Sequence, residues 1–275
     1  MLGAHMPAAG GLHNALLSGA EIGCEAVQLF VKSPSQWRAK PLTEEAIKKF
    51  HEVREETGLD CLVCHDAYLI NLASSDRTNL ARSRRAILDE LERCEELGIP
   101  YLVTHMGSHL GHGEDRGLVR LAKSVSWALE RSNVVMVLLE TMAGQGTNLG
   151  HQFEHIGQVM DAVGDSSRLG VCLDTCHVFS AGYDLRTPEV YEATWHKFEE
   201  VIGLEHLKVI HANDSKCEFG SRVDRHEHIG KGFLGRDAFK LLVNDHRLEK
   251  VPKIIETPDF REHRTNIRRL RRLMR

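Results

Sequence analysis

"VVMVLLET", residues 134–141, is apolar at almost every position and ends on one acid, Glu140. Side chains alternate between the two faces of a strand, so a run of this kind needs cover on both faces. Such strands are typical of parallel sheets that are covered by helices. The chain contains eight apolar runs of this length, at 2–6, 26–32, 61–66, 101–107, 134–141, 169–177, 207–214 and 253–258.

Longer amphipathic segments lie between these runs, for example "TEEAIKKFHEVREET" (43–57) and "NLARSRRAILDELERCEELG" (79–98). Their apolar residues recur with the 3.6-residue period of a helix, and a glycine ends the second. Eight strand–helix units in about 250 residues are typical of an α/β protein with a single (β/α)8 TIM barrel. We therefore expect one domain over residues 1–275. A doubly wound open sheet is the alternative, but no Gly-x-Gly-x-x-Gly motif follows the first strand.

The composition is that of an ordinary globular protein, with 42% hydrophobic and 27% charged residues among 275. The longest apolar runs are too short to span a bilayer, and residues 1–12 lack the basic start and apolar core of a signal peptide. Seven cysteines, an odd number, argue against a secreted disulfide scaffold. The sequence predicts a cytoplasmic protein with reduced thiols and no membrane partner.

The net charge of −4 does not indicate a general nucleic-acid binder, although a local basic groove can exist on an acidic protein. The most basic segment is the C-terminal "REHRTNIRRLRRLMR" (261–275). Ile267, Leu270 and Leu273 fall there at helical spacing, so this segment predicts a last surface helix rather than a DNA-binding arm.

Histidines and carboxylates lie where the predicted strands end. The C-terminal ends of barrel strands meet on one face, where the active sites of this fold are found. One histidine at a strand end is usually a hydrogen-bonded surface group, but six consecutive strands that end this way predict a metal site. The candidate ligands are His65, His105, Glu140, Asp174, His177, His211 and Glu256, with Asp224 and His226 from the loop before the last strand.

Imidazole and carboxylate ligands without thiolate favour zinc, manganese or iron. Nine candidates exceed the four or so ligands of one zinc ion, so two or three ions are expected. Cys61 and Cys64 form a C-x-x-C pair, but a strand places them on opposite faces, and we expect core thiols. His151 and His155 are expected to be exposed, and the position of His228 is left open.

Several motifs resemble the endonuclease IV family of zinc-dependent abasic-site DNA repair nucleases, also called AP endonuclease family 2. The motifs run in the family's order along nearly the whole chain, and the segments "DTCH…AGYDLRT" and "FGSRVDRH" are highly specific. They are "GAHMPAAGGL" (3–12), "HDAYLINLAS" (65–74), "HMGSH" (105–109), "ETMAGQGTNLG" (140–150), "GVCLDTCHVFSAGYDLRT" (170–187), "HANDSKCEFGSRVDRHEHIG" (211–230) and "IIETP" (254–258).

The resemblance implies a trinuclear zinc centre in which Glu140 bridges two ions. It assigns the first ion to His65, His105 and Glu140, the second to Asp174, His211 and Glu256, and the third to His177, Asp224 and His226. Glu256 and Glu140 are the implied catalytic residues, with Glu256 orienting the attacking hydroxide. The implied reaction is hydrolysis on the 5′ side of an abasic site in double-stranded DNA, which leaves a 3′ hydroxyl and a 5′ deoxyribose phosphate. Removal of 3′ blocking groups, replacement of zinc by Mn²⁺ and a monomeric state are also implied.

The chain departs from the family pattern near these positions. Met106 stands where the family usually has proline, and Thr141 and Met142 stand where Asn-Thr is usual. Ser35 replaces an arginine of the family's DNA-probing loop. The family's remaining DNA contacts have matching residues here: Gln36, Trp37, Arg38 and Tyr68.

Other functions fit parts of the same pattern. A metal-dependent sugar isomerase or epimerase would place similar ligands at the strand ends, but it needs one or two ions and acid–base groups rather than a third ligand triad. The triad of His177, Asp224 and His226 therefore favours the nuclease. A UV-damage endonuclease fits the motifs less completely, and a non-catalytic binding barrel would bind DNA without turnover.

Overall fold

Eight parallel strands form a closed barrel in the computed structural model, which describes residues 1–164 and 167–275. The predicted TIM barrel is confirmed, and the open doubly wound sheet is wrong. Neighbouring strands follow chain order, and the last strand pairs with the first. The strands are β1 (Leu2–His5), β2 (Ala26–Leu29), β3 (Cys61–His65), β4 (Tyr101–His105), β5 (Met136–Glu140), β6 (Leu169–Asp174), β7 (Leu207–His211) and β10 (Lys253–Ile255).

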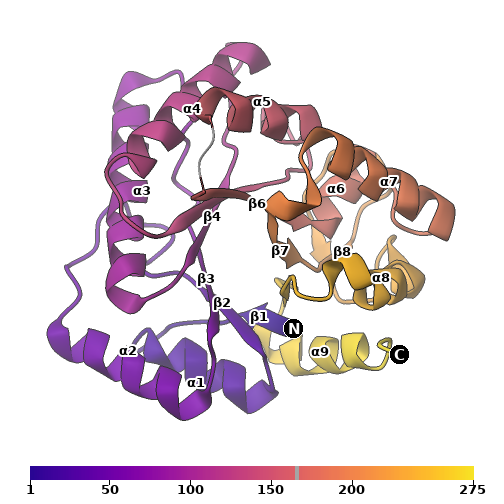
Figure 1. The fold of residues 1–275 in the computed structure, drawn as a ribbon, viewed down its shortest axis with the longest axis horizontal. Helices are drawn as coiled ribbons and strands as arrows, with labels where there is room; N and C mark the ends of the chain where they lie inside the picture. Colours follow the sequence, from indigo (N-terminus) through magenta and orange to yellow (C-terminus); the bar gives the residue numbers. More distant parts are fainter. Residues whose placement is uncertain (165–166) are drawn as a thin grey trace.

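Helices surround the strands on the outside of the barrel (Figure 1). They are α1 (His13–Ile22), α2 (Glu44–Thr57), α3 (Arg77–Leu97), α4 (Glu114–Leu129), α5 (Phe153–Val163), α6 (Thr175–Ala181), α7 (Pro188–Val201), α8 (Gly235–Asn244) and α9 (His263–Arg271). Single helical turns are η1 (Leu204–His206), η2 (His246–Leu248) and η3 (Phe260–Glu262). A two-stranded antiparallel pair, β8 (Asp214–Ser215) and β9 (His226–Glu227), lies in the loop after β7.

The run at 169–177 is not one strand, as predicted, but a strand followed by a helix. The strand ends at Asp174, whose Oδ1 accepts a hydrogen bond from the backbone N–H of His177 at 2.9 Å. A side chain that caps the first turn in this way favours a helix over further extended chain. Asp174 is therefore both the end of β6 and the N-cap of α6.

Apolar side chains close the bottom of the barrel from inside. Each of seven strands contributes one fully buried residue to this layer: Ala26, Val63, Val103, Leu138, Cys172, Val209 and Ile254. Strand β1 contributes Gly3 at the equivalent place, beside Ala26. A Cβ atom at Gly3 would lie 2.1 Å from the carbonyl oxygen of Ala26, so only glycine fits this close approach.

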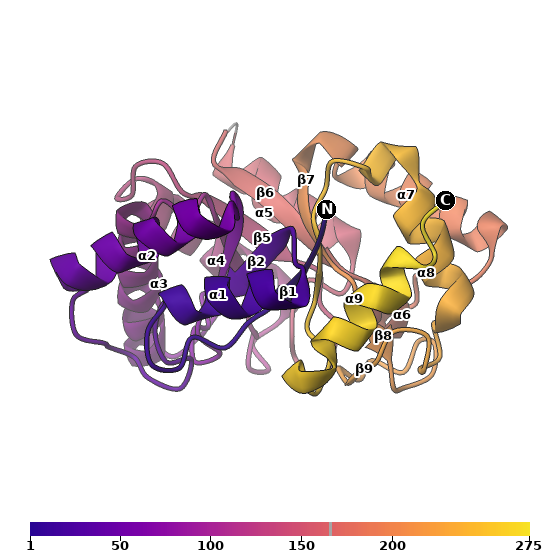
Figure 2. The same ribbon diagram turned by 90° about the horizontal axis from the view of Figure 1, so that it is seen from below.

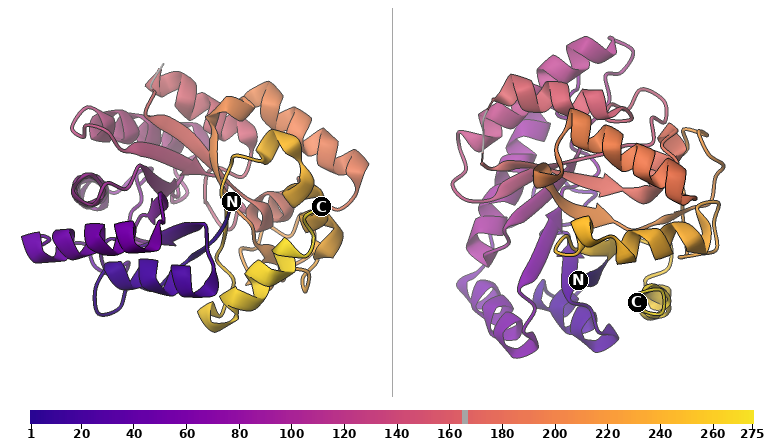
Figure 3. Two further views of the ribbon diagram at one scale, coloured as in Figure 1. Left: turned by 60° about the horizontal axis from the view of Figure 1, so that its bottom comes forward. Right: turned by 45° about the vertical axis from the view of Figure 1, so that its right-hand side comes forward.

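The last helix has the form that its sequence predicts. Ile267 and Leu270 of α9 are fully buried and Leu273 nearly so, whereas the arginines face outward. Figure 2 shows α9 beside α8 and close to β1, and the right panel of Figure 3 views it end-on. The basic C-terminal segment therefore closes the ring of helices next to the first strand.

The thiols match their prediction. All seven cysteines are free, Cys64 is fully buried and Cys61 is partly buried. Within residues 1–164 and 167–275, no helix combines the length and the apolar character that a membrane span requires.

Candidate metal centre

A ring of polar side chains lies above the apolar layer, at the mouth of the barrel. In each strand, the residue two positions after the apolar layer points to the same side and lies nearer the C-terminal end. Seven of these eight residues are ionisable, and the eighth is an amide. They are His5, Gln28, His65, His105, Glu140, Asp174, His211 and Glu256.

The first group of ligand atoms joins β3, β4 and β5. His65 Nε2 lies 3.1 Å and His105 Nε2 lies 3.2 Å from Glu140 Oε2. His65 and Glu140 are buried, and His105 is partly exposed to the cavity. The three side chains are thus close enough for their free electron pairs to share one ion.

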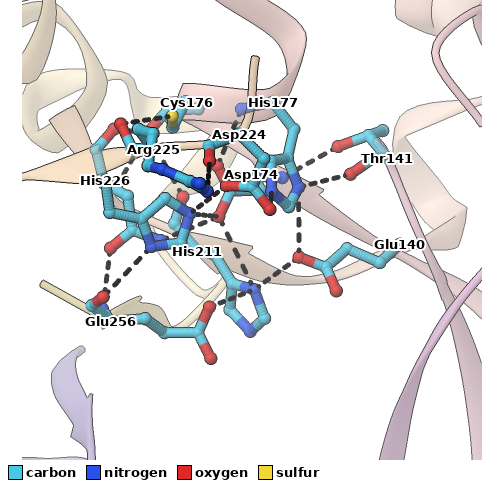
Figure 4. A network of polar contacts seen from close by, with 12 residues as sticks. Glu140, Thr141, Asp174, Cys176, His177, His211, Asp224, Arg225, His226 and Glu256 are labelled. Carbon is cyan, nitrogen blue, oxygen red and sulfur yellow. Dashed lines mark hydrogen bonds and ion pairs between the residues drawn. The ribbon is translucent and has the colours of Figure 1, made fainter. Parts of the chain in front are cut away.

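The second group surrounds the other oxygen of the same glutamate. His211 Nδ1 lies 2.9 Å from Glu140 Oε1, 3.2 Å from Glu256 Oε2 and 3.9 Å from Asp174 Oδ2. Glu140 therefore turns Oε2 to the first group and Oε1 to the second. Figure 4 shows Glu140 facing His211. A carboxylate that faces two ligand groups in this way has the geometry of a bridge.

The third group brings α6 together with the loop after β7. His177 Nε2 lies 3.2 Å from Asp224 Oδ2, and His226 Nε2 lies 3.5 Å from Asp224 Oδ1. Asp174 Oδ2 is also 3.5 Å from His226 Nε2, which connects the third group to the second. The pairing of β8 with β9 folds this loop back over the mouth, where Figure 4 shows His226 and Asp224 next to His177.

Hydrogen bonds to the backbone fix the imidazoles in the form that binds metal. The Nδ1–H groups of His65, His177 and His226 face the carbonyl oxygens of Asp66, Thr141 and Glu256, at 2.9, 2.8 and 3.0 Å. Donation from Nδ1 leaves the Nε2 electron pair of each ring free and directed at carboxylate oxygens. Within the described residues, Nε2 of His177 and of His226 makes no hydrogen bond although it is buried. The Nε2 electron pairs and the carboxylate oxygens repel each other unless a cation lies between them. This set of side chains therefore fits metal ions.

The carboxylates carry the charge that a ligand requires. Burial alone would raise the pKa of Glu140, but His211, His105 and His177 bring it well below its usual value. Burial likewise opposes the ionised form of Glu256, whose pKa His211, His5 and His65 nevertheless lower strongly. In the metal-free protein, burial lowers the pKa of His65, and Glu140, Glu256 and Asp66 outweigh this and raise it to about 10. Ions would therefore have to displace protons from the imidazoles.

One thiol lies close to the third group without the properties of a ligand. Cys176 neighbours Asp224 and His226, but its Sγ–H donates to the carbonyl oxygen of Arg225 at 3.6 Å. Burial raises the pKa of the Cys176 thiol to about 12. The thiol proton of Cys176 is thus directed at a backbone carbonyl and not at the side chains of Asp224 and His226.

Sequence reasoning missed His5 and Gln28, which complete the ring. Gln28 Nε2 donates to Glu256 Oε1 at 2.6 Å, and Gln28 Oε1 accepts from His211 Nε2–H at 2.8 Å. His5 Nδ1 lies 3.2 Å from the same Glu256 oxygen. Gln28 thereby fixes the His211 tautomer that leaves Nδ1 free for an ion. The signal was present in the sequence, because "LGAHM" and "AVQLFVK" each carry one polar residue at the inward position.

Replacing Gln28 with methionine should weaken zinc binding without unfolding the barrel. The variant keeps the side-chain volume but loses both hydrogen bonds, and such losses next to a metal ligand reduce affinity by roughly 10- to 100-fold. Competition with a fluorescent zinc chelator measures the affinity. Gln158→Met on the exposed side of α5 is the matched control. Equal zinc affinity of both variants would show that Gln28 does not hold His211 in its ligand form.

The departures from the family pattern are accommodated at the site. The Thr141 carbonyl oxygen accepts from His177, and Thr141 Oγ1 accepts from the backbone N–H of Asp174 at 2.9 Å. Met106 is fully buried and packs against Gly150, where a Cβ would lie 2.6 Å from Met106 Cγ. Met142 is also buried. Thr141 thus bonds to His177 and Asp174, and the ligand groups form with Met106 and Met142 in place.

Of the residues predicted to contact DNA, Tyr68 lines the cavity of about 990 Å³ at the barrel mouth, whereas Trp37 and Arg38 line a smaller cleft beside it. Tyr68 is 67% exposed and packs edge-on against Phe30 with ring centroids 5.3 Å apart. Gln36 and Arg38 are exposed, and Trp37 is partly buried, on the loop between β2 and α2. Ser35, in the same loop, is exposed and its hydroxyl lies 3.1 Å from that of Ser33.

Two histidines are wrongly predicted. His151 and His155 are buried, not exposed, and both face Glu114, with Nε2 to carboxylate oxygen distances of 3.7 and 3.6 Å. His155 Nδ1 accepts from the backbone N–H of Gly150, so the proton of neutral His155 is on Nε2, which points at Glu114. Because Nε2 of His155 carries a proton, it can donate to Glu114 but cannot bind a metal ion. The cluster of Glu114, His151 and His155 is therefore a polar contact between segments rather than a metal site. His228 lies beside Asn266, outside the cavity lining.

The fold and the ligand ring define a xylose isomerase-like TIM barrel, and the model of that family matches residues 18–275. A "Probable endonuclease 4" from Chloroflexus aggregans (strain MD-66 / DSM 9485) is 48% identical over 278 residues, which cover 99% of this chain and 97% of the relative. The crystal structure of endonuclease IV from Thermus thermophilus matches with a TM-score of 0.87 at 33% identity and covers 99% and 98% of the two chains. The chain belongs to the endonuclease IV family.

Another solved structure shares the architecture. The crystal structure of a D-tagatose 3-epimerase-like protein matches with a TM-score of 0.76 at 19% identity, over 98% of this chain and 96% of that one. At this identity the likeness shows the fold alone.

Proposed function

We propose that this protein is a DNA repair nuclease that hydrolyses the phosphodiester on the 5′ side of abasic sites in double-stranded DNA. The products are a 3′ hydroxyl and a 5′ deoxyribose phosphate, and the same site also removes 3′ blocking groups. The whole chain, residues 1–275, acts as one catalytic domain. Three zinc ions are held by the nine side chains that the family resemblance assigns.

The observation that carries this proposal is the third ligand group. An isomerase or epimerase has no use for three linked groups, whereas cleavage of a phosphodiester requires neutralisation of charge on the attacking, bridging and leaving oxygens. His177 and His226 form a possible metal group with Asp174, and Asp224 lies 3.2 Å from His177 Nε2 and 3.5 Å from His226 Nε2. Together with the identity to the "Probable endonuclease 4" relatives, it supports a nuclease rather than a sugar enzyme.

The protein's own side chains supply positioning and proton acceptance. Bound divalent ions contribute Lewis acidity, which lowers the pKa of water and stabilises negative charge on phosphate oxygens. Gln28 and His5 hold Oε1 of Glu256, so that Oε2 remains directed into the site as an ionised acceptor that orients the attacking water. Glu140 fixes the separation of the first two ligand groups by facing both.

The cavity at the mouth provides room for a sugar phosphate that has left the helical stack. The energetic cost of extruding a nucleotide is lowest where no base stacks, which favours an abasic position. We expect the exposed ring of Tyr68 and the loop residues Gln36, Trp37 and Arg38 to contact the distorted duplex, and the exposure of Tyr68, Gln36 and Arg38 supports this. Ser35 has only a short side chain in this loop. The contacts with DNA are therefore expected from the neighbouring Gln36, Trp37 and Arg38.

Three further properties belong to the proposal. The ligand chemistry also tolerates Mn²⁺ in place of one or more zinc ions. The seven free thiols are in keeping with a cytoplasmic location. The protein acts as a monomer.

A duplex with one tetrahydrofuran abasic analogue tests the activity. The purified protein, with its metal content measured, should produce a single nick immediately 5′ to the analogue and leave an end that a DNA polymerase extends. The same duplex with an intact base should remain uncut. A fully zinc-loaded protein that leaves the abasic duplex uncut would overturn the repair assignment.

A further inference from the structure

A second, smaller cleft lies outside the barrel between the β2–α2 loop and α3. Its volume is about 220 Å³, well below that of the large cavity. The residues that line it are Trp37, Arg38, Ala39, Arg82, Arg85 and Asp89. Helices α2 and α3 lie side by side at this edge of the molecule (Figure 1).

The cleft carries unneutralised positive charge on a protein whose net charge is −4. Arg38, Arg82 and Arg85 are exposed, and none makes an ion pair or a side-chain hydrogen bond in the part of the chain that the structure describes. The only acid in the lining, Asp89, is already engaged at 3.1 Å by Lys32 Nζ and at 3.2 Å by Arg93 Nε. Three guanidinium groups therefore surround the cleft without a counterion from the protein.

The partners of Asp89 hold the loop in place over α3. Lys32 Nζ donates to the carbonyl oxygen of Trp37 at 3.4 Å, and Arg93 donates to that of Lys40 at 2.7 Å. Arg93 thus ties the Lys40 end directly to α3, and Lys32, which itself pairs with Asp89, ties the Trp37 end to it indirectly. Arg38 is presented beside the α3 arginines by these bonds.

The same network connects the cleft with the large cavity. Lys32 lines the cavity, while its buried ammonium reaches Asp89 of the cleft. Helix α3 also follows the loop that leaves β3 at the barrel mouth, so its first turns lie at the level of the mouth. A DNA duplex that lies over the cavity can therefore extend along the β2–α2 loop and reach the arginines of the cleft.

We propose that this cleft binds phosphates of the DNA duplex beyond the lesion, as a second contact outside the catalytic cavity. The inference rests on the proposed function. Guanidinium groups match phosphate oxygens with paired donors and are weakly hydrated, so they suit backbone contacts. Contacts of this kind carry no sequence preference and add affinity that falls with salt.

A salt titration of DNA binding tests the cleft. Arg82→Gln combined with Arg85→Gln removes the two α3 charges that line the cleft and keeps residues that favour a helix at these exposed positions. Binding of the variant to a long abasic-analogue duplex should show a salt slope about 1.8 smaller than that of the unaltered protein, since each lost phosphate contact removes about 0.9. An increase from 50 to 200 mM salt should then weaken the unaltered protein about 12-fold more than the variant. On a short duplex that covers only the cavity, the two proteins should bind alike.

Arg268→Gln on α9 combined with Arg272→Gln just after it is the matched control, because these arginines are exposed and unpaired among the described residues. It loses the same charge and should keep the full slope. An equal loss in both variants would mean that net charge alone acts, and an unchanged slope in the α3 variant would show that the cleft does not touch DNA. Either result would overturn the cleft and leave the cleavage assignment intact. The opposite outcome is also distinguishable. If the protein does not cleave DNA but only the α3 variant shows the smaller salt slope, the repair function is wrong and the DNA contact at the cleft stands.

Discussion

Replacing Glu256 with glutamine is expected to reduce cleavage of an abasic-site duplex by about 10³-fold, within the range known for loss of one positioned proton acceptor. Glutamine preserves the shape of the side chain, and its oxygen can still accept from Gln28. The negative charge that faces His211 is lost, however, and with it the group that orients the attacking water. Single-turnover rates with enzyme in excess measure the chemical step directly.

Metal analysis of the same samples separates loss of catalysis from loss of the centre. We expect the Glu256→Gln protein to keep most of its zinc, because the other ligands remain. Glu262→Gln, at an exposed position before α9, is the control for charge and should retain full activity. A fully active, zinc-loaded Glu256→Gln protein would exclude Glu256 from the reaction.

Removal of metal should abolish cleavage and lower thermal stability. A ligand that binds only the folded state stabilises it by about 4 kcal/mol when its free concentration is about 1,000 times its dissociation constant. Dialysis against a chelator should therefore lower the midpoint of thermal unfolding by several degrees per tightly bound ion, as calorimetry would record. Restoring zinc should recover both properties. A chelated protein with unchanged midpoint and full activity would show that no ion takes part.

The loss of metal should also depend on pH. In the absence of ions, burial lowers the pKa of His65, but the neighbouring carboxylates, Glu140 foremost, outweigh burial and raise this pKa to about 10. Protons therefore compete with metal for Nε2 at every pH below that value, and the competition strengthens as the pH falls. Zinc affinity measured by chelator competition should rise from about pH 6 to about pH 8. Affinity that does not change over this range would mean that His65 is not a ligand.

The barrel was predictable because its pattern repeats. Each of the eight apolar runs contains a strand of the barrel. A strand that is covered on both faces is apolar at nearly every position, and such a run is visible in the sequence. The exact ends were not predictable. Residues 175–177 were assigned to a strand, but the Asp174 side chain caps a helix there, and that bond depends on tertiary geometry.

The ligand ring was only partly predictable. Histidines and acids at strand ends stand out in an apolar context, whereas a lone His5 in a short first strand and an uncharged Gln28 do not. The burial of His151 could not be read from a glycine-rich loop. Gly144 permits it, since a Cβ there would lie 2.9 Å from the Cβ of His151. Such close approaches between loops leave no periodic signal in the sequence.

The double use of Asp174 has a consequence for how the centre is assembled. One of its oxygens caps α6 and the other accepts from Asn213 Nδ2 at 2.7 Å, so the rotamer is chosen when the helix forms. His177, in the same helical turn, is oriented by its own bond to Thr141. Ions therefore arrive at ligands whose conformational freedom was lost during folding. Binding of an ion at these two side chains then requires the release of protons from the imidazole and of water from the ion, but no change in the helix.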